Sequence, residues 1–320
     1  MAHDMAPSAR LALGVDMSLK DWIKARVAAM DAAVRPWALR RRVNGWAYEF
    51  LLFGLKQAWA CLFGGAMLAL ILGAHVFWPA QAPIARYDFL VVCAVLIQAF
   101  MLATRLERWD EALVILIFHA VGTIMEVFKT AHGSWIYPEH SLLRIGGVPL
   151  FSGFMYASIG SYIARVRRLF DIRFVNYGPL WAPWILAVLS YANFFTHHYG
   201  PDIRWGLFAF SALIWRRAWF QFTPDLAARR MPILLGVILV ALFIWIAENL
   251  GTFAGAWVYP SQTHGWTVVP IGKVGAWYLL IILSFVLTTL VHRPEPPAPS
   301  LDLMPLPGTG AEAESGSFDF

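Results

Sequence analysis

The chain has 320 residues, of which 59% are hydrophobic and 14% charged, and its mean hydropathy is +0.59. Such a composition excludes an ordinary soluble domain, and the apolar runs are long enough to cross a bilayer, which indicates an integral membrane protein. The net charge is +5, but the basic residues stand beside the apolar runs, where they set topology, so we expect no nucleic-acid partner.

An amphipathic helix is predicted within the N-terminal segment, residues 1–45. Apolar residues recur at helical spacing after Ser18, a residue type favoured as an N-cap: Leu19, Trp22, Ile23, Val27, Met30 and Val34. Such a helix lies on the inner membrane surface or packs on a neighbouring element. We expect residues 1–17 and the tail 294–320, which is rich in Pro, Gly and Ser, to be disordered.

Eight membrane-spanning helices are predicted between these ends, and none is expected to break in its middle. Their approximate ranges are 50–78, 87–104, 111–129, 148–166, 179–197, 205–222, 231–252 and 267–292. Pro149 and Pro270 are expected to open the fourth and the eighth span, because proline is tolerated in the first helical turn. The fold class is therefore all-α, a polytopic helical bundle.

The basic residues beside or near the ends of the spans alternate from one side of the membrane to the other. Nineteen would lie on the side of the N-terminus, and five on the opposite side, namely Arg86, Lys129, Arg144, Arg204 and Lys273. This asymmetry predicts that both termini lie on the cytoplasmic side of a bacterial inner membrane.

The pattern of residues 126–138 recurs later in the chain. The stretch 248–260 repeats Glu, Thr, Gly, Trp, Tyr and Pro in the same order, so six of thirteen positions agree at an offset of 248 − 126 = 122. Chance alignment predicts about one match. We therefore predict two parallel four-span repeats, residues 46–172 and 173–293, related by an axis along the membrane normal.

Glu126 and Glu248 are the principal candidates for chemistry. They occupy equivalent places near the outer ends of the third and seventh spans, where an ionisable group costs roughly 2.5–3.5 kcal/mol and needs an explanation. Thr130 and Thr252 follow four residues later on the same helical face and are expected to reach the carboxylates. Two carboxylates sharing a site do not both ionise readily, which predicts a proton donor beside a proton acceptor. Alternatively, Glu126 pairs with Lys129 and Glu248 pairs with Lys273, and these pairs only join helices.

Histidines and a further acid extend this candidate site. His75 and His197 form a second symmetric pair at outer span ends, and His119 lies two turns before Glu126 on the same face. His119 either contacts substrate or is hydrogen-bonded within the bundle. Glu139 has Ser261 as its counterpart, so it could distinguish a catalytic half from a supporting one. The chain lacks HxxxH, HExxH and DxxxD spacings; we assign no metal site, and no cofactor can be named.

The Gly-x-Trp-x-Tyr-Pro segments predict abrupt helix ends. Glycine ends the helix, the aromatic side chains anchor the chain at the membrane interface, and proline prevents the helix from continuing. Tyr137 and Tyr259, together with Lys129, Thr130, Thr252 and His119, are the candidate substrate-binding residues.

Three stretches, residues 126–139, 147–156 and 248–260, resemble the bacterial membrane family of domain-of-unknown-function 817, the YoaT-like proteins. The resemblance covers roughly residues 40–292 and implies no established activity. A looser similarity connects Pro138-Glu139, Glu126 and Glu248 to the membrane carotenoid cyclases and hydratases. The acidic doublet that follows proline in those enzymes is missing here.

The leading functional hypothesis is an enzyme that acts on an isoprenoid or lipid substrate from the outer side of the membrane. Glu126 or Glu248 would donate a proton, and the other carboxylate, His75 or His197 would accept one. The alternatives are a proton- or cation-coupled transporter, or a scaffold whose carboxylates only join helices. The sequence identifies no partner other than the lipid bilayer, and it leaves the oligomeric state open.

Overall fold

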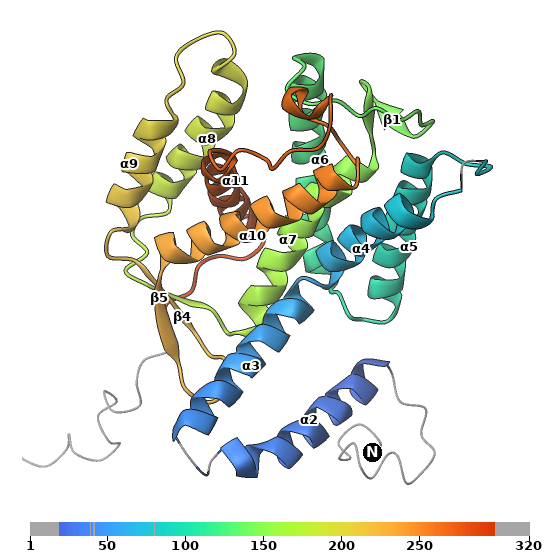
Figure 1. The fold of residues 1–320 in the computed structure, drawn as a ribbon. Coiled ribbons are helices and arrows are strands. Elements are labelled where there is room, and N and C mark those ends of the chain that lie inside the picture. The colour runs from blue at the N-terminus through green and yellow to red at the C-terminus, as the bar shows by residue number, and fades with distance from the viewer. Residues whose placement is uncertain (1–18, 39, 41, 80, 298–320) are drawn as a thin grey trace, which may run out of the picture.

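The computed structural model describes residues 19–38, 40, 42–79 and 81–297, and this part of the chain is mostly helical (Figure 1). Residues 1–17 and most of the tail, for which we predict disorder, lie outside it. The helices are α2 (Leu19–Ala38), α3 (Arg42–Ala60), α4 (Leu62–Phe77), α5 (Arg86–Ala103), α6 (Trp109–Ala131), α7 (Phe151–Leu169), α8 (Trp181–Thr196), α9 (Arg204–Trp215), α10 (Ile233–Phe253), the short 3-10 helix η2 (Pro260–Gln262) and α11 (Lys273–Thr288).

Three of the described helices, α5, α6 and α10, are long and apolar enough to cross a membrane. The pair α3 and α4 adds a fourth if it counts as one broken span, and α11 is apolar but shorter. Large apolar side chains on α10, such as Phe243, Ile246 and Phe253, are exposed. Water does not favour such a surface, whereas lipid does, so these helices are consistent with a membrane protein.

The first predicted span is not one straight helix. Asn44–Ala60 and Leu62–Phe77 meet at Cys61 with a bend of 69°, although we expected no break within a span. Glycines at positions 54, 64, 65 and 73 weaken the helical preference of this segment. Ser158 of α7 lies 3.3 Å from where a side chain at Gly64 would begin, so α4 packs closely on α7 just after the bend.

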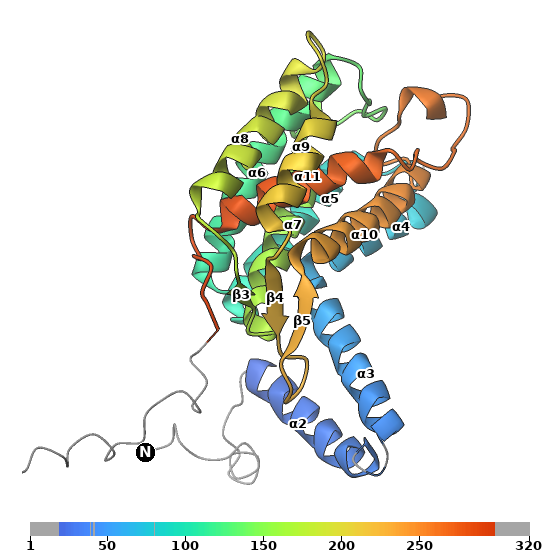
Figure 2. The ribbon, with the colours of Figure 1, turned by 90° about the vertical axis from the view of Figure 1, so that its left-hand side faces the viewer.

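The chain also forms two small β-sheets, so the prediction of an all-α fold is incomplete. The sixth predicted span ends early: α9 stops at Trp215, before Arg216 and Arg217, and Trp219–Phe222 forms β4 between β3 (Arg173–Val175) and β5 (Arg229–Pro232). Three of the four residues of β4 are aromatic, a residue type that suits a strand, and neighbours on both sides pair its backbone. Figure 2 shows this sheet beside α3.

The second sheet is a hairpin of β1 (Arg144–Ile145) and β2 (Val148–Pro149). Gly146 and Gly147 both have positive φ, +56° and +82°, as a two-residue hairpin turn requires. Pro149 is therefore the end of a strand, and α7 begins two residues later, contrary to the expectation that this proline opens the helix. The eighth predicted span likewise starts late, because α11 begins at Lys273.

The main core lies among α6, α7, α8, α9, α10 and α11, with β3 at one edge. Close approach of α6 and α7 is possible because Gly122 has no side chain: a Cβ there would lie 2.5 Å from Cβ of Tyr156. The predicted amphipathic helix is present as α2, and Arg35 joins it to Asp225 of the β4–β5 turn at 2.9 Å. Helix α2 leads into the start of α3 on the side of the molecule away from α8 (Figure 2).

Helix ends recur at the spacing of the sequence repeat. Helix α6 ends at Ala131 and α10 at Phe253, and α7 begins at Phe151 and α11 at Lys273, so both differences are 122 residues. The stretches that connect these helices hold the predicted site.

Candidate functional site

Two matching helix ends position the aromatic residues of the site. Gly133 and Gly255 both adopt φ +66°, a left-handed conformation that glycine takes without strain. Their amides donate to the carbonyls of Thr130 and Thr252, each at 3.0 Å. The helices end abruptly, as the motif predicts. The chain then reverses, and Trp135, Tyr137 and Tyr259 donate hydrogen bonds to Glu126 or Glu248 instead of serving as the membrane-interface anchors that we expected.

Glu126 is 4% exposed and accepts three hydrogen bonds from neutral donors. The indole N–H of Trp135 and the hydroxyl of Tyr137 donate to Oε2, both at 2.7 Å, and the hydroxyl of Tyr156 donates to Oε1 at 2.7 Å. Two of the donors come from the reversing segment and the third from α7. These contacts offset the loss of water around a buried carboxyl group.

Glu248, also 4% exposed, has a related but smaller set of donors. The hydroxyl of Tyr259 donates to Oε1 at 2.5 Å, and the indole N–H of Trp277 on α11 donates to Oε2 at 2.7 Å. Tyr259 is the counterpart of Tyr137, but the counterpart of Trp135, Trp257, instead packs its ring where a side chain at Gly251 would begin, 2.5 Å away. The two carboxyl groups therefore have similar but unequal surroundings.

The two reversing segments touch each other. Ile136 and Val258 form an isolated antiparallel bridge, and each amide donates to the carbonyl of the other residue at 2.9 Å. The rings of Trp135 and Tyr259 meet edge to face, with centroids 5.9 Å apart. The hydrogen-bonding groups of Glu126 and Glu248 consequently adjoin.

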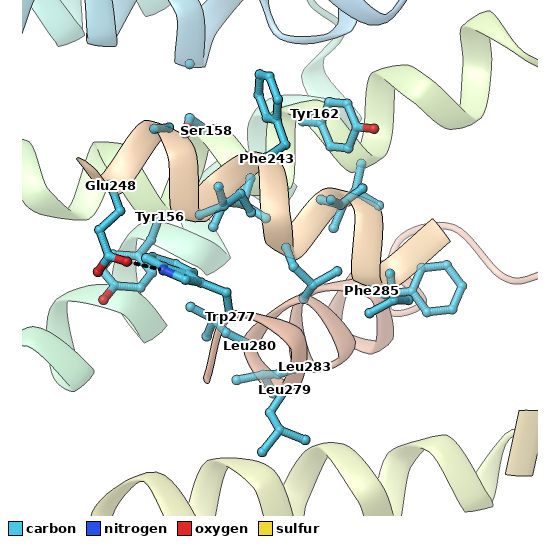
Figure 3. A pocket seen from close by; sticks show the side chains of 18 of the residues that line it. Tyr156, Ser158, Tyr162, Phe243, Glu248, Trp277, Leu279, Leu280, Leu283 and Phe285 are labelled. Carbon is cyan, nitrogen blue, oxygen red and sulfur yellow. Dashed lines mark hydrogen bonds between the residues drawn. The ribbon is translucent and has the colours of Figure 1, made fainter. Parts of the chain in front are cut away.

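Both carboxyl groups line one cavity of about 1000 Å³. The end that we call polar holds Glu126, Glu248 and their Tyr and Trp donors. The rest is mostly apolar, although Arg167 and His292 also line it. Figure 3 shows Glu248 bonded to Trp277 near Tyr156, and Leu279, Leu283 and Phe285 of α11 leading away from them. The sequence left open whether the carboxylates share a cavity; the structure places them in the same one.

Among the described contacts, neither Lys129 nor Lys273 lies within ion-pair distance of Glu126 or Glu248, so the alternative of Glu126–Lys129 and Glu248–Lys273 ion pairs is not found; Lys273 acts on Glu248 only from a greater distance. Lys129 Nζ lies 3.1 Å from Nε2 of His197 and 2.7 Å from Nε2 of His198. Lys273 Nζ lies 4.4 Å from the centre of the Tyr259 ring. Both lysines line the cavity, as does His197.

The two threonines do not reach the carboxylates, contrary to expectation. The hydroxyl of Thr130 is buried without a hydrogen-bond partner among the described residues. The hydroxyl of Thr252 donates to the carbonyl of Asn249 and accepts from the indole of Trp266 at 3.2 Å. The tyrosine and tryptophan side chains already occupy the carboxylate oxygens.

The remaining predicted residues lie outside the cavity lining. Glu139 forms a salt bridge of 2.5 Å with Arg86. His75 is exposed and contacts the ring of Phe253 at 5.6 Å. His119 packs against Phe154 at 4.6 Å, and its Nδ1 is buried without a hydrogen-bond partner in the described part of the chain. These three side chains are not brought together with Glu126 and Glu248.

Burial keeps the hydroxyl groups of Tyr137 and Tyr259 protonated, so both can donate hydrogen bonds. It raises the pKa of Tyr137 and of Tyr259 well above the usual range, and the neighbouring carboxylates, Glu126 and Glu248 respectively, add to the rise. Burial, and next the ammonium of Lys129, lowers the pKa of His198. The His198 ring is therefore neutral at pH 7 and can accept from Lys129.

Histidines gather near Lys129, but the described residues contain no group of three or more metal-ligating side chains suited to a metal ion. The rings of His132 and His198 are 5.0 Å apart, and those of His197 and His198 are 4.3 Å apart. His132 Nε2 contacts the hydroxyl of Tyr199 at 2.5 Å.

Arg86, Tyr156 and Trp277 were not predicted as site residues. Arg86 is 8% exposed and donates to the carbonyls of Ala254 and Gly255, both at 3.0 Å, as well as to Glu139. Its signal in the sequence was its place among the five basic residues on the otherwise sparsely charged side. Tyr156 recurs as Tyr278 at the repeat spacing, but Tyr278 contacts Ser211 at 2.7 Å instead of Glu248.

The fold and site define a helical protein with membrane-compatible helices and an apolar cavity that ends in two hydrogen-bonded carboxyl groups. The chain belongs to the family described as "Protein of unknown function (DUF817)", which matches residues 49–285 and confirms the predicted family. A relative from Bacillus subtilis (strain 168), "Uncharacterized protein YoaT", is 41% identical over 252 residues, which cover 79% of this chain and 95% of the relative. No solved structure matches significantly.

Proposed function

We propose that this protein is an inner-membrane enzyme that acts on an isoprenoid or lipid substrate, with Glu126 and Glu248 as its acid and base. The observation that carries the proposal is the shared cavity: an apolar chain fits its long part, and both carboxyl groups lie at its polar end. Binding pockets of this size bury most of a small-molecule ligand.

In the proposed reaction, the protonated carboxyl group of Glu126 or Glu248 transfers its proton to a double bond or a leaving group of the substrate. The other carboxylate, or His197 at the cavity wall, accepts the proton that the substrate loses. The Tyr and Trp donors hold both carboxyl groups in fixed orientations before the substrate binds.

The substrate test is mass spectrometry of small molecules that co-purify with the protein in mild detergent, comparing wild type with the Glu126→Gln, Glu248→Gln double variant. Glutamine keeps the size of each side chain but cannot transfer a proton as a carboxyl group does. We expect wild type to release an apolar-chain product and the double variant to retain its unconverted precursor.

Glu49→Gln serves as the matched control, because it removes a carboxylate that lies outside the cavity and pairs with Arg229. The same molecule in equal amount in wild type and double variant would contradict acid–base chemistry at Glu126 and Glu248. An empty cavity in both would favour a transporter of a soluble compound, or a scaffold.

The proposal includes eight spans in two parallel four-span repeats, with both termini in the cytoplasm. The bridge between Ile136 and Val258 supports the repeat, because the two residues occupy equivalent positions, 122 apart. The matching ends of α6 and α10 support it too. The basic residues support the orientation.

Reporter fusions test this topology. An alkaline phosphatase joined after Gly200, between α8 and α9, is expected to be active, because this loop faces outward in the proposed arrangement. The same reporter joined after Leu226, in the β4–β5 turn, is expected to be inactive. A reporter that fluoresces only in the cytoplasm is expected to fluoresce at that position. Equal phosphatase activity at the two positions would rule out a membrane crossing by the intervening segment.

A further inference from the structure

Three cationic side chains meet at the polar end of the cavity. Lys129 comes from the last turn of α6, Lys273 is the first residue of α11, Arg204 is the first residue of α9, and all three line the cavity. Lys129 is within electrostatic reach of Lys273 and Arg204, and Lys273 is within reach of Arg204, Glu126 and Glu248. Positive charge is thus concentrated where the apolar part of the cavity ends.

Lys129 is buried, at 5% exposure, yet no carboxylate of the described residues lies within ion-pair distance of it. Two of its three N–H groups point to the Nε2 atoms of His197 and His198. Nδ1 of His197 lies 2.7 Å from the carbonyl of Asn193, which places its proton there and leaves Nε2 to accept. The ammonium also lies 4.4 Å from the centre of the Phe194 ring, and a carboxylate that acts on it, Asp202, already pairs with Arg204. A buried cation that has no ion pair of its own favours an anionic ligand.

Lys273 is half-buried and contacts aromatic faces, with Nζ 5.5 Å from the centre of the Trp135 ring and 4.4 Å from that of Tyr259. The nearby carboxylate oxygens are already occupied by neutral donors: Trp135, Tyr137 and Tyr156 on Glu126, and Tyr259 and Trp277 on Glu248. Arg204 differs from the lysines because it pairs with Asp202 at 2.5 Å. Of the three cations at this end, the two lysines are thus the ones that have no carboxylate within ion-pair distance in the described part of the chain.

We infer that Lys129 and Lys273 bind a phosphate group carried by the apolar ligand, so that the substrate class is a phosphorylated isoprenoid or acyl chain. A phosphate has several oxygens and can accept from two ammonium groups on different helices, whereas a neutral alcohol cannot balance their charge. The apolar chain then follows the α11 side of the cavity towards Phe285 (Figure 3). This inference rests on the proposed binding of an apolar-chain ligand.

The test is equilibrium binding of tritiated farnesyl monophosphate and, separately, tritiated farnesol to the full-length protein in mild detergent. We expect wild type to bind farnesyl monophosphate at least about tenfold more tightly than farnesol, because charge-assisted hydrogen bonds add to apolar burial. Lys129→Gln and Lys273→Gln should each weaken farnesyl monophosphate binding about tenfold and leave farnesol binding unchanged. Retained farnesol binding shows that a variant is folded. Arg217→Gln removes an exposed positive charge outside the cavity and should change neither affinity.

Each other outcome overturns the inference in a distinguishable way. Equal affinity for the phosphate and the alcohol, insensitive to both lysine substitutions, would leave the apolar site intact and remove the phosphate subsite. Displacement of farnesyl monophosphate by inorganic phosphate at similar concentration would identify a site for a free anion instead of a chain-borne one. Binding of neither farnesyl compound would overturn the proposed function along with the inference.

Discussion

The Glu126→Ala variant is expected to unfold at a markedly lower temperature than wild type. Alanine leaves the buried N–H of Trp135 and the hydroxyls of Tyr137 and Tyr156 without their acceptor. A buried donor without a partner costs about 1–3 kcal/mol, so the free energy of unfolding should fall by about 3 kcal/mol or more. Thermal unfolding in detergent, followed by circular dichroism, measures the effect.

Glu126→Gln is the matched control for this prediction. Its amide oxygen can still accept from Trp135 and Tyr137, and the hydroxyl of Tyr156 can turn and accept from the amide nitrogen. We expect a loss of about 1 kcal/mol or less. Equal melting temperatures for the alanine and glutamine variants would show that the three hydrogen bonds do not stabilise the fold.

The second large effect is expected at Arg86, which joins the start of α5 to the end of α10. Arg86→Met removes the donors to the carbonyls of Ala254 and Gly255 and leaves the carboxylate of Glu139 without its partner. Because the guanidinium is 8% exposed, we expect a loss of about 2–4 kcal/mol in the free energy of unfolding. Chemical or thermal unfolding of the purified variant tests this.

A double-variant cycle with Glu139→Gln separates the two kinds of contact. The side chain of Glu139 is 38% exposed, so Glu139→Gln alone should cost about 1 kcal/mol or less. Most of the loss in Arg86→Met should persist in the double variant, because the two carbonyls remain unpaired. If Glu139→Gln is as damaging as Arg86→Met, the ion pair and not the carbonyl contacts holds α5 to α10.

The sequence predicted the family, and the two carboxyl groups that it singled out, Glu126 and Glu248, line one cavity. In both copies of the repeated stretch, a glycine ends the helix and aromatic residues return over it. These residue types follow one another closely along the chain, so their order can be recognised in the sequence. The donors Tyr156 and Trp277 come from α7 and α11, and their pairing with Glu126 and Glu248 depends on how helices pack. Spacing along the chain does not encode that packing.

Hydropathy was a poor guide to where helices end. Residues 219–222 are apolar enough to extend a span, yet they form a strand because β3 and β5 pair with both edges. The bend at Cys61 and the late start of α11 were missed for a similar reason: an apolar run defines length and polarity but not backbone direction. Pro149 was misplaced because the Gly146–Gly147 turn was not recognised.

The five basic residues predicted on the sparsely charged side include most of the cations near the two carboxyl groups. Nineteen basic residues were assigned to one side of the membrane, and the five exceptions were used only to orient the chain. Among those five, Lys129, Arg204 and Lys273 line the cavity, and Arg86 joins α5 to α10. Three of the five residues predicted on the sparsely charged side therefore lie at the candidate site.

The bridge between Ile136 and Val258 has a further consequence for how such a protein could arise. In an isologous dimer, the residue at the symmetry axis of one subunit pairs with the same residue of the other. The bridge has this form, since each residue donates to and accepts from its counterpart at 2.9 Å. A half-length ancestor that formed such a pair would have had identical carboxyl sites on both sides of the axis. Fusion of two such chains would then free each copy to change separately, which would account for the unequal donors of Glu126 and Glu248.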